Sequence, residues 1–306
     1  MRVLVTGATG FLGAAVVRHL RHEGHETWAA ERAPTSPSRP GMERIQLDLS
    51  DRDRIEAVVK QVAPEAIVHC AALGTSAPER DFVALADVTI TATLALHAAA
   101  RRAGVARFIH IGTAFEYGPH DAPVDESTPC NPLGAYAVAK AAASSLLMSA
   151  ATMHGLPPVV LRLFNLFGPG DKPGRLGSDL VACARSGNPL ALSAGAQRRN
   201  FMFVEDAARV VSALLGLAPE QNPAGRVLNV GFDDSCTVRE FAERFARELG
   251  ISALLRFGER TADRDKPHHL YSECRAFAEF CRASGLTHLL TKTPLDRAAA
   301  QCLGSS

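Results

Sequence analysis

The sequence is poor in aromatic residues and has no excess of either charge. Only 6% of its 306 residues are Phe, Trp or Tyr, and 33 Lys and Arg residues oppose 32 Asp and Glu residues, so that the formal net charge is +1. Because neither sign predominates, we expect no electrostatic attraction to nucleic acid or to a membrane surface. This balance favours a protein that acts on a small molecule.

Cysteine pairs at metal-ligand spacing and long apolar runs are also missing. The seven cysteines are scattered, odd in number and without a C-x-x-C pair, which argues against a disulfide framework and against a zinc site. The N-terminus passes from Met1 directly into a short strand, and no run reaches the ~18 apolar residues of a membrane span. We therefore expect no bound metal, no signal peptide, no membrane segment and a cytoplasmic location.

Hydrophobic residues are abundant, at 47% of the chain, enough for a large core in one domain or in two closely joined ones. In the first half, apolar strands alternate with segments of helical periodicity, which predicts an α/β fold with a Rossmann-like, doubly wound parallel sheet for residues 1–165. Beyond Gly170 the alternation loosens. Residues 166–306 are predicted to form a smaller α/β lobe that binds substrate.

A glycine-rich turn joins the first predicted strand, residues 2–6, to a helix. Such a turn lets the backbone approach a pyrophosphate, whose charge is met by the N–H groups at the start of the helix. The G-x-x-G-x-x-G spacing departs by one residue from the general dinucleotide fingerprint, and glycines also serve plain turns. We predict cofactor contacts from six residues of this turn: Gly7, Thr9, Gly10, Phe11, Leu12 and Gly13.

The second predicted strand, residues 24–30, is followed by Glu31 and Arg32, about 20 residues after the glycines. An acid at this position can hold both hydroxyls of the adenosine ribose, which favours NAD. Arg32 could instead pair with a 2′-phosphate. The sequence therefore leaves NAD and NADP open.

Two later strand ends supply further predicted cofactor contacts. Asp48 and Leu49 follow the third strand and are expected near the adenine, although Asp48 could instead cap a helix. Ala71 and Ala72 follow the fourth strand, where small residues let a cofactor lie close to the backbone. His69, at the end of that strand, is expected to be a core histidine.

Tyr136 and Lys140 stand one helical turn apart, on one face and about 6 Å from each other. A free tyrosine ionises near pH ~10, and a fixed positive charge such as the Lys140 ammonium favours its phenolate. Thr113 stands at the carboxyl end of the fifth strand, where active sites of parallel sheets collect, so that its hydroxyl can meet this helix face. The alternative is an ordinary Tyr with a solvated Lys, and a turn-capping Thr.

In combination, these motifs resemble the extended short-chain dehydrogenase/reductases, also called the NAD-dependent epimerase/dehydratase family. The matching segments follow the family order and are T-G-A-T-G-F-L-G at 6–13, Thr113 four residues before Tyr117-Gly118, Tyr136-x-x-x-Lys140, R-L-F-N-L-F-G-P-G at 162–170, R-N-F-M-F-V-E-D at 199–206 and R-T-A-D at 260–263. The resemblance covers nearly the whole chain.

The resemblance implies an enzyme that acts on a nucleotide-activated sugar. Tyr136 matches the family's acid/base, Lys140 its pKa-lowering partner and ligand of the nicotinamide ribose, and Thr113 the hydroxyl that orients the reacting sugar oxygen. Three further positions match residues that hold the sugar nucleotide: Asn165, Arg199 and Arg260. For the two arginines, surface salt bridging is the alternative.

Departures from the family pattern narrow the expected reaction. The 4,6-dehydratases carry an Asp-Glu pair where this chain has Ala114 and Phe115, and decarboxylating members carry a Glu at the position of Phe115. Glu116 stands where an apolar residue is usual and is similar to the Glu-Tyr-Gly ending among reductases of 4-keto-6-deoxy sugars, unless it is only a strand-end surface residue. Asp87 replaces an Asn that the family generally keeps.

We therefore expect an NAD(P)-dependent ketoreductase of a nucleotide-linked 4-keto-6-deoxyhexose. A nucleotide-sugar 4-epimerase uses the same three residues and is the alternative enzyme. A non-catalytic NAD(P)-binding regulatory protein is a third possibility, although such proteins commonly lose the Tyr or the Lys. The alanine-rich helices predicted at 82–103 and 135–154 are expected to form a homodimer, as they do in similar enzymes.

Overall fold

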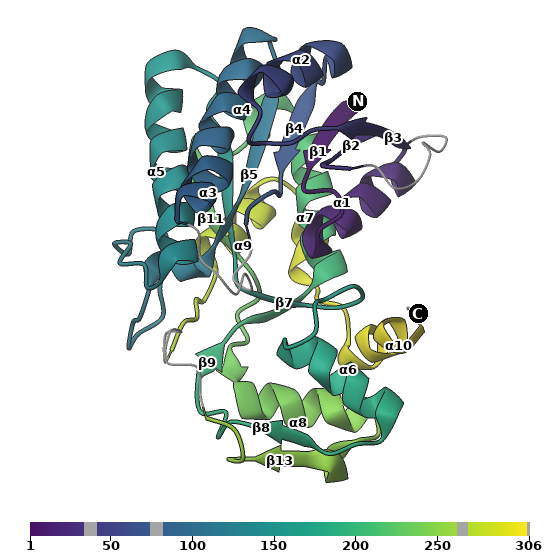
Figure 1. Cartoon of the computed structure of the whole chain (residues 1–306). Coiled ribbons are helices and arrows are strands. Elements are labelled where there is room, and N and C mark those ends of the chain that lie inside the picture. Colours follow the sequence, from purple (N-terminus) through teal and green to yellow (C-terminus); the bar gives the residue numbers. More distant parts are fainter. Residues whose placement is uncertain (34–41, 74–81, 262–268, 305–306) are drawn as a thin grey trace.

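The computed structural model describes residues 1–33, 42–73, 82–261 and 269–304 (Figure 1). Seven parallel strands form its central sheet, in the order β11-β6-β5-β4-β1-β2-β3. The strands are β1 (Arg2–Thr6), β2 (Glu26–Glu31), β3 (Met42–Gln46), β4 (Ala66–His69), β5 (Arg107–Thr113), β6 (Val159–Leu163) and β11 (Arg226–Val230). The strand order reverses between β1 and β4, which opens a crevice for a ligand at their carboxyl ends.

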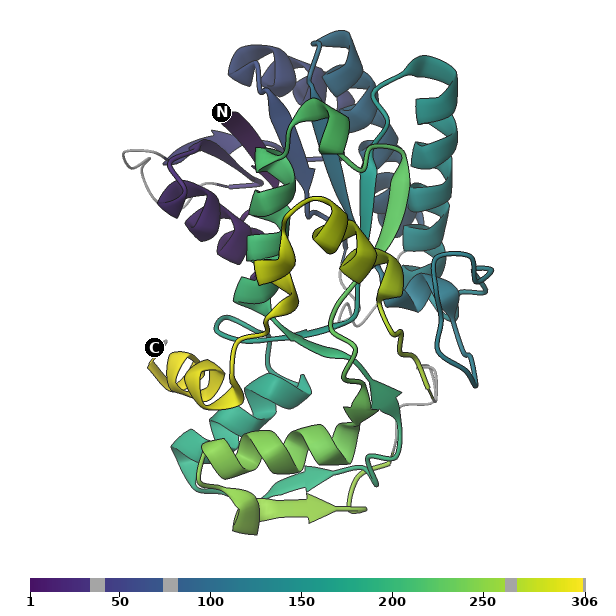
Figure 2. The same ribbon diagram turned by 180° about the vertical axis from the view of Figure 1, so that it is seen from behind.

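Helices cover both faces of this sheet, as the two opposite views show (Figures 1 and 2). One face carries α1 (Phe11–His22), α7 (Val204–Gly216) and α9 (Arg275–Ala283), and the other carries α2 (Arg52–Val62), α3 (Phe82–Ala86), the π-helical turn η1 (Asp87–Thr91), α4 (Ala92–Arg102) and α5 (Ala135–His154). Successive strand residues point to opposite faces. Accordingly Val3 and Val5 pack in the core on the α1 side, and Leu4 packs in the core on the α2 side.

The rest of the chain builds a smaller lobe below the carboxyl ends of the strands (Figure 1). Three two-stranded sheets pair β7 (Asn165–Phe167) with β10 (Phe201–Phe203), β8 (Leu190–Leu192) with β13 (Leu255–Phe257), and β9 (Arg198–Arg199) with β12 (Cys236–Thr237). Its helices are α6 (Leu176–Ser186), α8 (Val238–Glu248) and α10 (Leu295–Gly304). Short 3-10 turns occur in both parts of the molecule: η2 (Ala114–Tyr117) follows β5, η3 (Pro219–Gln221) follows α7, η4 (Ser252–Leu254) precedes β13 and η5 (Thr287–Leu290) follows α9. Phe167 packs edge-on against Phe241 and Phe245 in the core of this lobe.

The predicted doubly wound parallel sheet with a smaller second lobe is confirmed. The strand β11 was not predicted, because it comes from the part of the chain where the strand and helix pattern loosens. It pairs with β6, so that the sheet draws one strand from beyond the lobe division predicted at residue 165. The helix α7, also from beyond it, packs against α1.

One described stretch, Phe82–Arg102, is long and apolar enough to span a membrane by length and composition. Core helices of water-soluble proteins satisfy the same criterion. In this structure the stretch packs against α2 and α5 at the side of the sheet, which accounts for part of its apolar character.

Candidate active site

The glycine turn after β1 forms a tight cradle at the crevice between β1 and β4. Gly7 has φ of +67°, and a Cβ there would lie 2.8 Å from the backbone of Ala71. A Cβ at Gly13 would lie 2.1 Å from the carbonyl oxygen of Gly7, and the Gly10 N–H donates to the same oxygen at 2.9 Å. Only glycine therefore fits at positions 7 and 13, and the predicted contacts in this turn and at Ala71 lie side by side.

The N-terminus of α1 opens onto this cradle. Gly10 is its N-cap residue and has no side-chain capping bond, and the first turn contains no acidic residue. The N–H groups of that turn are thus not capped by a side chain, and the helix dipole adds positive potential. The arrangement fits the diphosphate of a dinucleotide, the group that the sequence predicted here.

At the end of β2, Glu31 is buried and points one carboxylate oxygen at Arg44, whose Nη1 donates to Oε1 at 2.5 Å. Its second oxygen, Oε2, is buried and without a hydrogen-bond partner among the described residues. A ribose hydroxyl is a donor of the kind that this oxygen lacks. The sequence did not point to Arg44, because its approach to Glu31 depends on the pairing of β2 with β3.

Arg32, next to Glu31, is exposed. It is close enough to Asp48 to help lower the pKa of that carboxyl, after the larger effect of hydrogen bonds from Ser50. Asp51, rather than Asp48, caps the following helix α2 by accepting from the Arg54 N–H. The structure thus leaves Asp48 exposed at the cofactor side and excludes the capping role considered for it.

Cofactor preference is expected to depend on Glu31 and Arg32. Glu31→Ala should weaken NAD binding by roughly 1.5 to 3 kcal/mol, because a charge-assisted hydrogen bond to the ribose is lost. Arg32→Ala should leave NAD binding nearly intact and weaken NADP binding if this arginine reads the 2′-phosphate. Titration of each variant with both reduced cofactors, followed by nicotinamide fluorescence, measures the four affinities.

Arg44→Ala is the matched control, since it frees Glu31 without removing it. It should cost less NAD affinity than Glu31→Ala. An equal loss of both cofactors in the Glu31 and Arg32 variants would mean that the end of β2 does not face the adenosine ribose.

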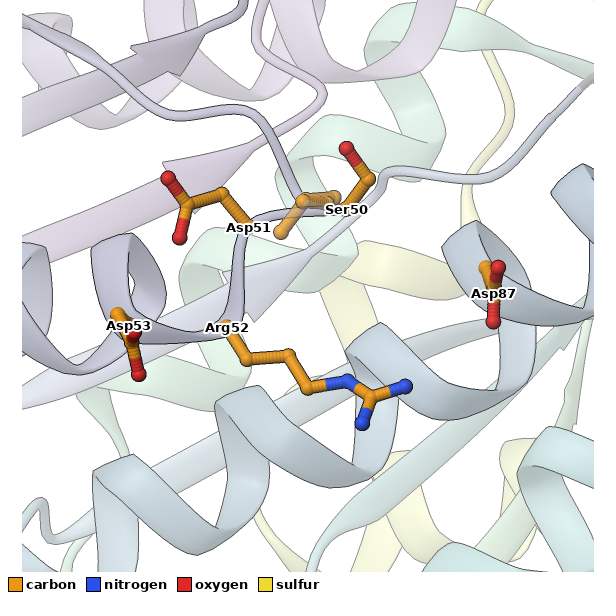
Figure 3. Close-up of a pocket in the computed structure, with 6 residues that line it drawn as sticks. Ser50, Asp51, Arg52, Asp53 and Asp87 are labelled. Atoms are coloured by element: carbon orange, nitrogen blue, oxygen red, sulfur yellow. The ribbon is translucent and has the colours of Figure 1, made fainter.

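A cavity of about 400 Å³ lies beside the predicted adenine position (Figure 3). Its lining residues are Leu49, Ser50, Asp51, Arg52, Asp53 and Asp87. In Figure 3 the Arg52 side chain extends from the start of α2 toward the helical segment that carries Asp87. Asp87 begins the π-helical turn η1 and contributes a carboxylate to this cavity.

Tyr136 and Thr113 meet where α5 packs against the end of β5 and the turn η2. Thr113 is the last residue of β5 and is buried, and its side chain lies near enough to the Tyr136 phenol to lower the pKa of that group. The Thr113 Oγ1 also accepts from the Phe115 N–H at 3.3 Å. The hydroxyl and the phenol that the sequence predicted to converge are therefore adjacent.

Lys140 lies one turn further along α5 and is buried. Its Nζ donates to the carbonyl oxygen of Ile111 at 2.5 Å and lies 3.3 Å from the Nε2 of His110. Burial lowers the pKa of Lys140 to about 8. His110 is a neighbour that the sequence did not suggest, since a strand histidine carries no signal of what it contacts. His69 is fully buried, as expected.

The expected lowering of the Tyr136 pKa by Lys140 is wrong for this structure. Burial, followed by the negative charge of Glu116, raises the pKa of Tyr136 to about 12. The Arg175 charge and the bond to Thr113 act in the opposite direction and are smaller. The Lys140 ammonium is held by the carbonyl of Ile111 instead. The phenol is therefore protonated at neutral pH.

Glu116 is not a surface residue, because no part of it is exposed. Its Oε1 accepts from the Thr113 N–H at 2.9 Å, and its Oε2 accepts from the Arg162 Nε at 2.9 Å. Thr113 and Glu116 form a capping box around the turn η2. The Thr-x-x-Glu spacing is a sequence signature of that motif and could have indicated the buried position.

The three predicted sugar-nucleotide residues lie in separate segments of the second lobe, two on strands and one in the bend after β13. Asn165, on β7, donates through Nδ2 to the Asn200 carbonyl oxygen at 3.2 Å. Arg199 is buried on β9, donates to the Arg198 carbonyl oxygen at 2.7 Å, and has its pKa lowered to about 10 by burial. Arg260 is exposed, and its backbone N–H donates to the carbonyl oxygen of Leu192. Asp263, in the same matching motif, lies outside the described residues.

Comparisons with known proteins agree with this geometry. The family model described as "NAD dependent epimerase/dehydratase family" matches residues 3–231. A curated dTDP-6-deoxy-L-talose 4-dehydrogenase (NAD(P)(+)) of Kitasatospora kifunensis is 32% identical over 262 residues, covering 82% of this chain and 80% of the relative. A dTDP-glucose 4,6-dehydratase of Neisseria gonorrhoeae is 31% identical over 255 residues, covering 75% and 72% of the two chains.

Solved structures of nucleotide-sugar enzymes are also similar to this chain over almost its whole length. The structure of MoeE5 in complex with UDP-glucuronic acid and NAD superposes with a TM-score of 0.83 at 28% sequence identity, covering 99% of this chain and 98% of the other. A UDP-glucose 4-epimerase of Thermus thermophilus in complex with NAD has a TM-score of 0.81, with 23% identity and full coverage of both chains. At that identity the second likeness concerns the fold alone.

Proposed function

The chain belongs to the NAD-dependent epimerase/dehydratase family, the extended short-chain dehydrogenase/reductases, and within it we propose a ketoreductase of a nucleotide-linked 4-keto-6-deoxyhexose. It is an enzyme with NAD or NADP as its cofactor. The observation that carries the proposal lies in the turn after β5, where Ala114 and Phe115 replace the acid pair of the dehydratases. The one carboxylate in that turn, Glu116, is held by Arg162 and the Thr113 N–H and is not available to eliminate water.

The protein's own residues supply the proton in the proposed reaction. Bound reduced nicotinamide supplies the hydride. Tyr136 donates its phenolic proton to the ketone oxygen, while the hydroxyl of the neighbouring Thr113 orients that oxygen. Lys140 contributes positive charge beside the cofactor ribose. The raised pKa of Tyr136 supports the donor role, because at neutral pH the phenol holds the proton that reduction requires.

The relatives support the substrate class. The Kitasatospora enzyme is named for dehydrogenation at position 4 of a dTDP-linked 6-deoxy sugar, which is the proposed reaction read in reverse. The MoeE5 structure contains a UDP-sugar acid. We accordingly assign Asn165, Arg199 and Arg260 to the sugar nucleotide, since arginines offer several donors to a diphosphate. The smaller lobe, formed by the part of residues 165–306 outside α7, β11 and α9, is proposed to bind it.

The experiment is incubation with dTDP- and UDP-linked 4-keto-6-deoxyglucose in the presence of NADH or NADPH. Stoichiometric consumption of reduced cofactor and formation of a 6-deoxyhexose product support reduction. An isomerised nucleotide sugar without net cofactor turnover would instead indicate the 4-epimerase. Tight cofactor binding without turnover of either kind would favour the regulatory protein, although that class commonly lacks the Tyr or the Lys.

We also propose that the enzyme acts as a cytoplasmic homodimer. Large hydrophobic side chains on α3 and α5 are exposed, with Phe82, Val83 and Met153 about 70% accessible and Val138 and Leu146 about half accessible. The two segments pack against each other, and a second copy could cover their outer faces as a four-helix bundle.

Light scattering at micromolar concentration is expected to give twice the 32.5 kDa chain mass. Val83→Glu should shift the population toward monomer, because it buries an unpaired charge in the bundle. Leu303→Glu, an exposed apolar position on α10, is the matched control and should leave the mass unchanged. A monomer mass for the unmodified chain would refute the dimer.

A further inference from the structure

The Glu116 carboxylate is fully buried, and the residues around it leave space for it and provide its ion-pair partner. The carboxylate lies behind the strand end that carries Thr113, with 0% exposure, and its ion-pair partner Arg162 on β6 is 7% exposed at the side chain. A Cβ at Gly112 would lie 2.7 Å from the Glu116 Oε1. Glycine at position 112 therefore leaves the space into which the carboxylate fits.

The pair is held from several sides. Arg162 donates through Nε to Glu116 at 2.9 Å and through Nη2 to the Cys130 Sγ at 3.0 Å, and its guanidinium lies 4.5 Å above the Tyr117 ring. The Tyr117 hydroxyl in turn donates to the Asn229 side chain at 2.7 Å. A buried carboxylate is costly unless it is paired and hydrogen-bonded, and this network meets both conditions.

We propose that Glu116 is a positioning residue for the proton donor: its carboxylate fixes the Thr113 end of β5 and places a buried negative charge in the turn η2, which packs against the Tyr136 helix. This role deepens the proposed ketoreductase function and rests on it. Glu116 is fully buried and acts through Thr113 and Tyr136.

Two charged side chains from neighbouring elements act on the phenol: Glu116 from η2 and Arg175 from the segment that leads into α6. Lys140 belongs to the same helix as Tyr136, and its Nζ donates to the carbonyl oxygen of Ile111. Of these, Glu116 has the largest charge effect on Tyr136, and it favours the neutral phenol.

The ionisation of Tyr136 can be measured without any substrate. The chain contains only three tyrosines, so that protein labelled with ¹³C at tyrosine Cζ gives three resonances, and Tyr136→Phe identifies the one of interest. The resonance is followed against pH, with and without saturating cofactor. In the unmodified protein we expect a Tyr136 midpoint at strongly alkaline pH, because its pKa is raised to about 12.

Glu116→Gln keeps the shape and one acceptor for the Thr113 N–H while removing the charge. The Tyr136 midpoint should move to lower pH by about one pH unit, the effect of one buried charge at intermediate distance. Since the single variant leaves Arg162 without its carboxylate, Glu116→Gln/Arg162→Met removes both charges and should fold better. The double variant should show the same downward movement.

Arg162→Lys is the matched control, since it keeps a cation beside Glu116 and should leave the Tyr136 midpoint unchanged. A midpoint that stays in place or rises in the double variant would overturn the proposal and reduce Glu116 to a structural cap. With a confirmed substrate, the alkaline limb of ketone reduction should move in parallel. Failure of the ketoreductase proposal would leave the titration result standing, because the resonance requires no turnover.

Discussion

Replacement of Tyr136 by phenylalanine is expected to slow ketone reduction by about 10² to 10⁴-fold, the usual contribution of a positioned acid. The change removes the phenolic oxygen but keeps the ring, so that packing and cofactor affinity should change little. Single-turnover reduction measures the rate, and fluorescence titration of the bound reduced cofactor measures the affinity. Near-normal turnover of this variant on a confirmed substrate would show that the proton comes from another group.

Unlike replacement of Tyr136, replacement of Lys140 should lower both the rate of ketone reduction and the cofactor affinity. Lys140→Ala removes a buried cation that we place beside the nicotinamide ribose, so that cofactor affinity should fall together with the rate. Burial lowers the pKa of Lys140 to about 8, and a lysine is charged only below its pKa. In the unmodified enzyme, cofactor affinity should therefore decline as the pH rises through about 8.

The Lys140→Arg variant tests whether the decline in cofactor affinity near pH 8 comes from loss of the positive charge at position 140. An arginine keeps its charge throughout the accessible pH range, so that the decline near pH 8 should disappear even if the absolute affinity is lower. Persistence of the decline in this variant would assign it to another group. The alkaline effect expected from Tyr136 lies much higher, because its pKa is raised to about 12.

The sequence was informative where one local pattern determines the outcome. The Gly7–Gly13 turn, the early strands and the helix with Tyr136 and Lys140 all have short-range signals, and the carboxyl ends of parallel strands necessarily meet at one edge of the sheet. The convergence of Thr113 with Tyr136 follows from these two facts. For the same reason the sheet and its crevice could be predicted before any coordinates were known.

The features of the site that the sequence did not predict depend on contacts between residues that lie far apart in the chain. Arg44 lies beside Glu31 because β2 and β3 pair in this register. Glu116 can be buried because its ion-pair partner Arg162 lies on the neighbouring strand β6. The pKa of Tyr136 shows the consequence. Its direction depends on burial and on which charge lies on which side of the phenol, and helical spacing to Lys140 alone predicts the wrong sign.

A substitution in the glycine turn after β1 has the largest expected effect on the free energy of unfolding. Gly13→Ala places a methyl group 2.1 Å from the carbonyl oxygen of Gly7 and 2.8 Å from its carbonyl carbon, and both are backbone atoms of a tight turn that cannot move aside. The helix α1 would have to shift away from β1. Overpacking of this kind costs about 3 kcal/mol or more, and cofactor binding should be lost with the geometry of the turn.

Two other glycines make this prediction specific. A Cβ at Gly10 meets only the Gly7 carbonyl oxygen, at 3.1 Å, so that Gly10→Ala should cost little stability while it obstructs the approach of the diphosphate and weakens cofactor binding. Gly216, at the end of α7, has no atom within 4 Å of an added Cβ, and Gly216→Ala should be neutral or stabilising by up to about 1 kcal/mol. Urea denaturation of the cofactor-free protein, paired with cofactor titration, should therefore rank the three variants differently in the two measurements. A Gly13→Ala protein as stable as the unmodified chain would show that the turn is looser than its contacts indicate, and that the glycine at position 13 is not what holds α1 against β1.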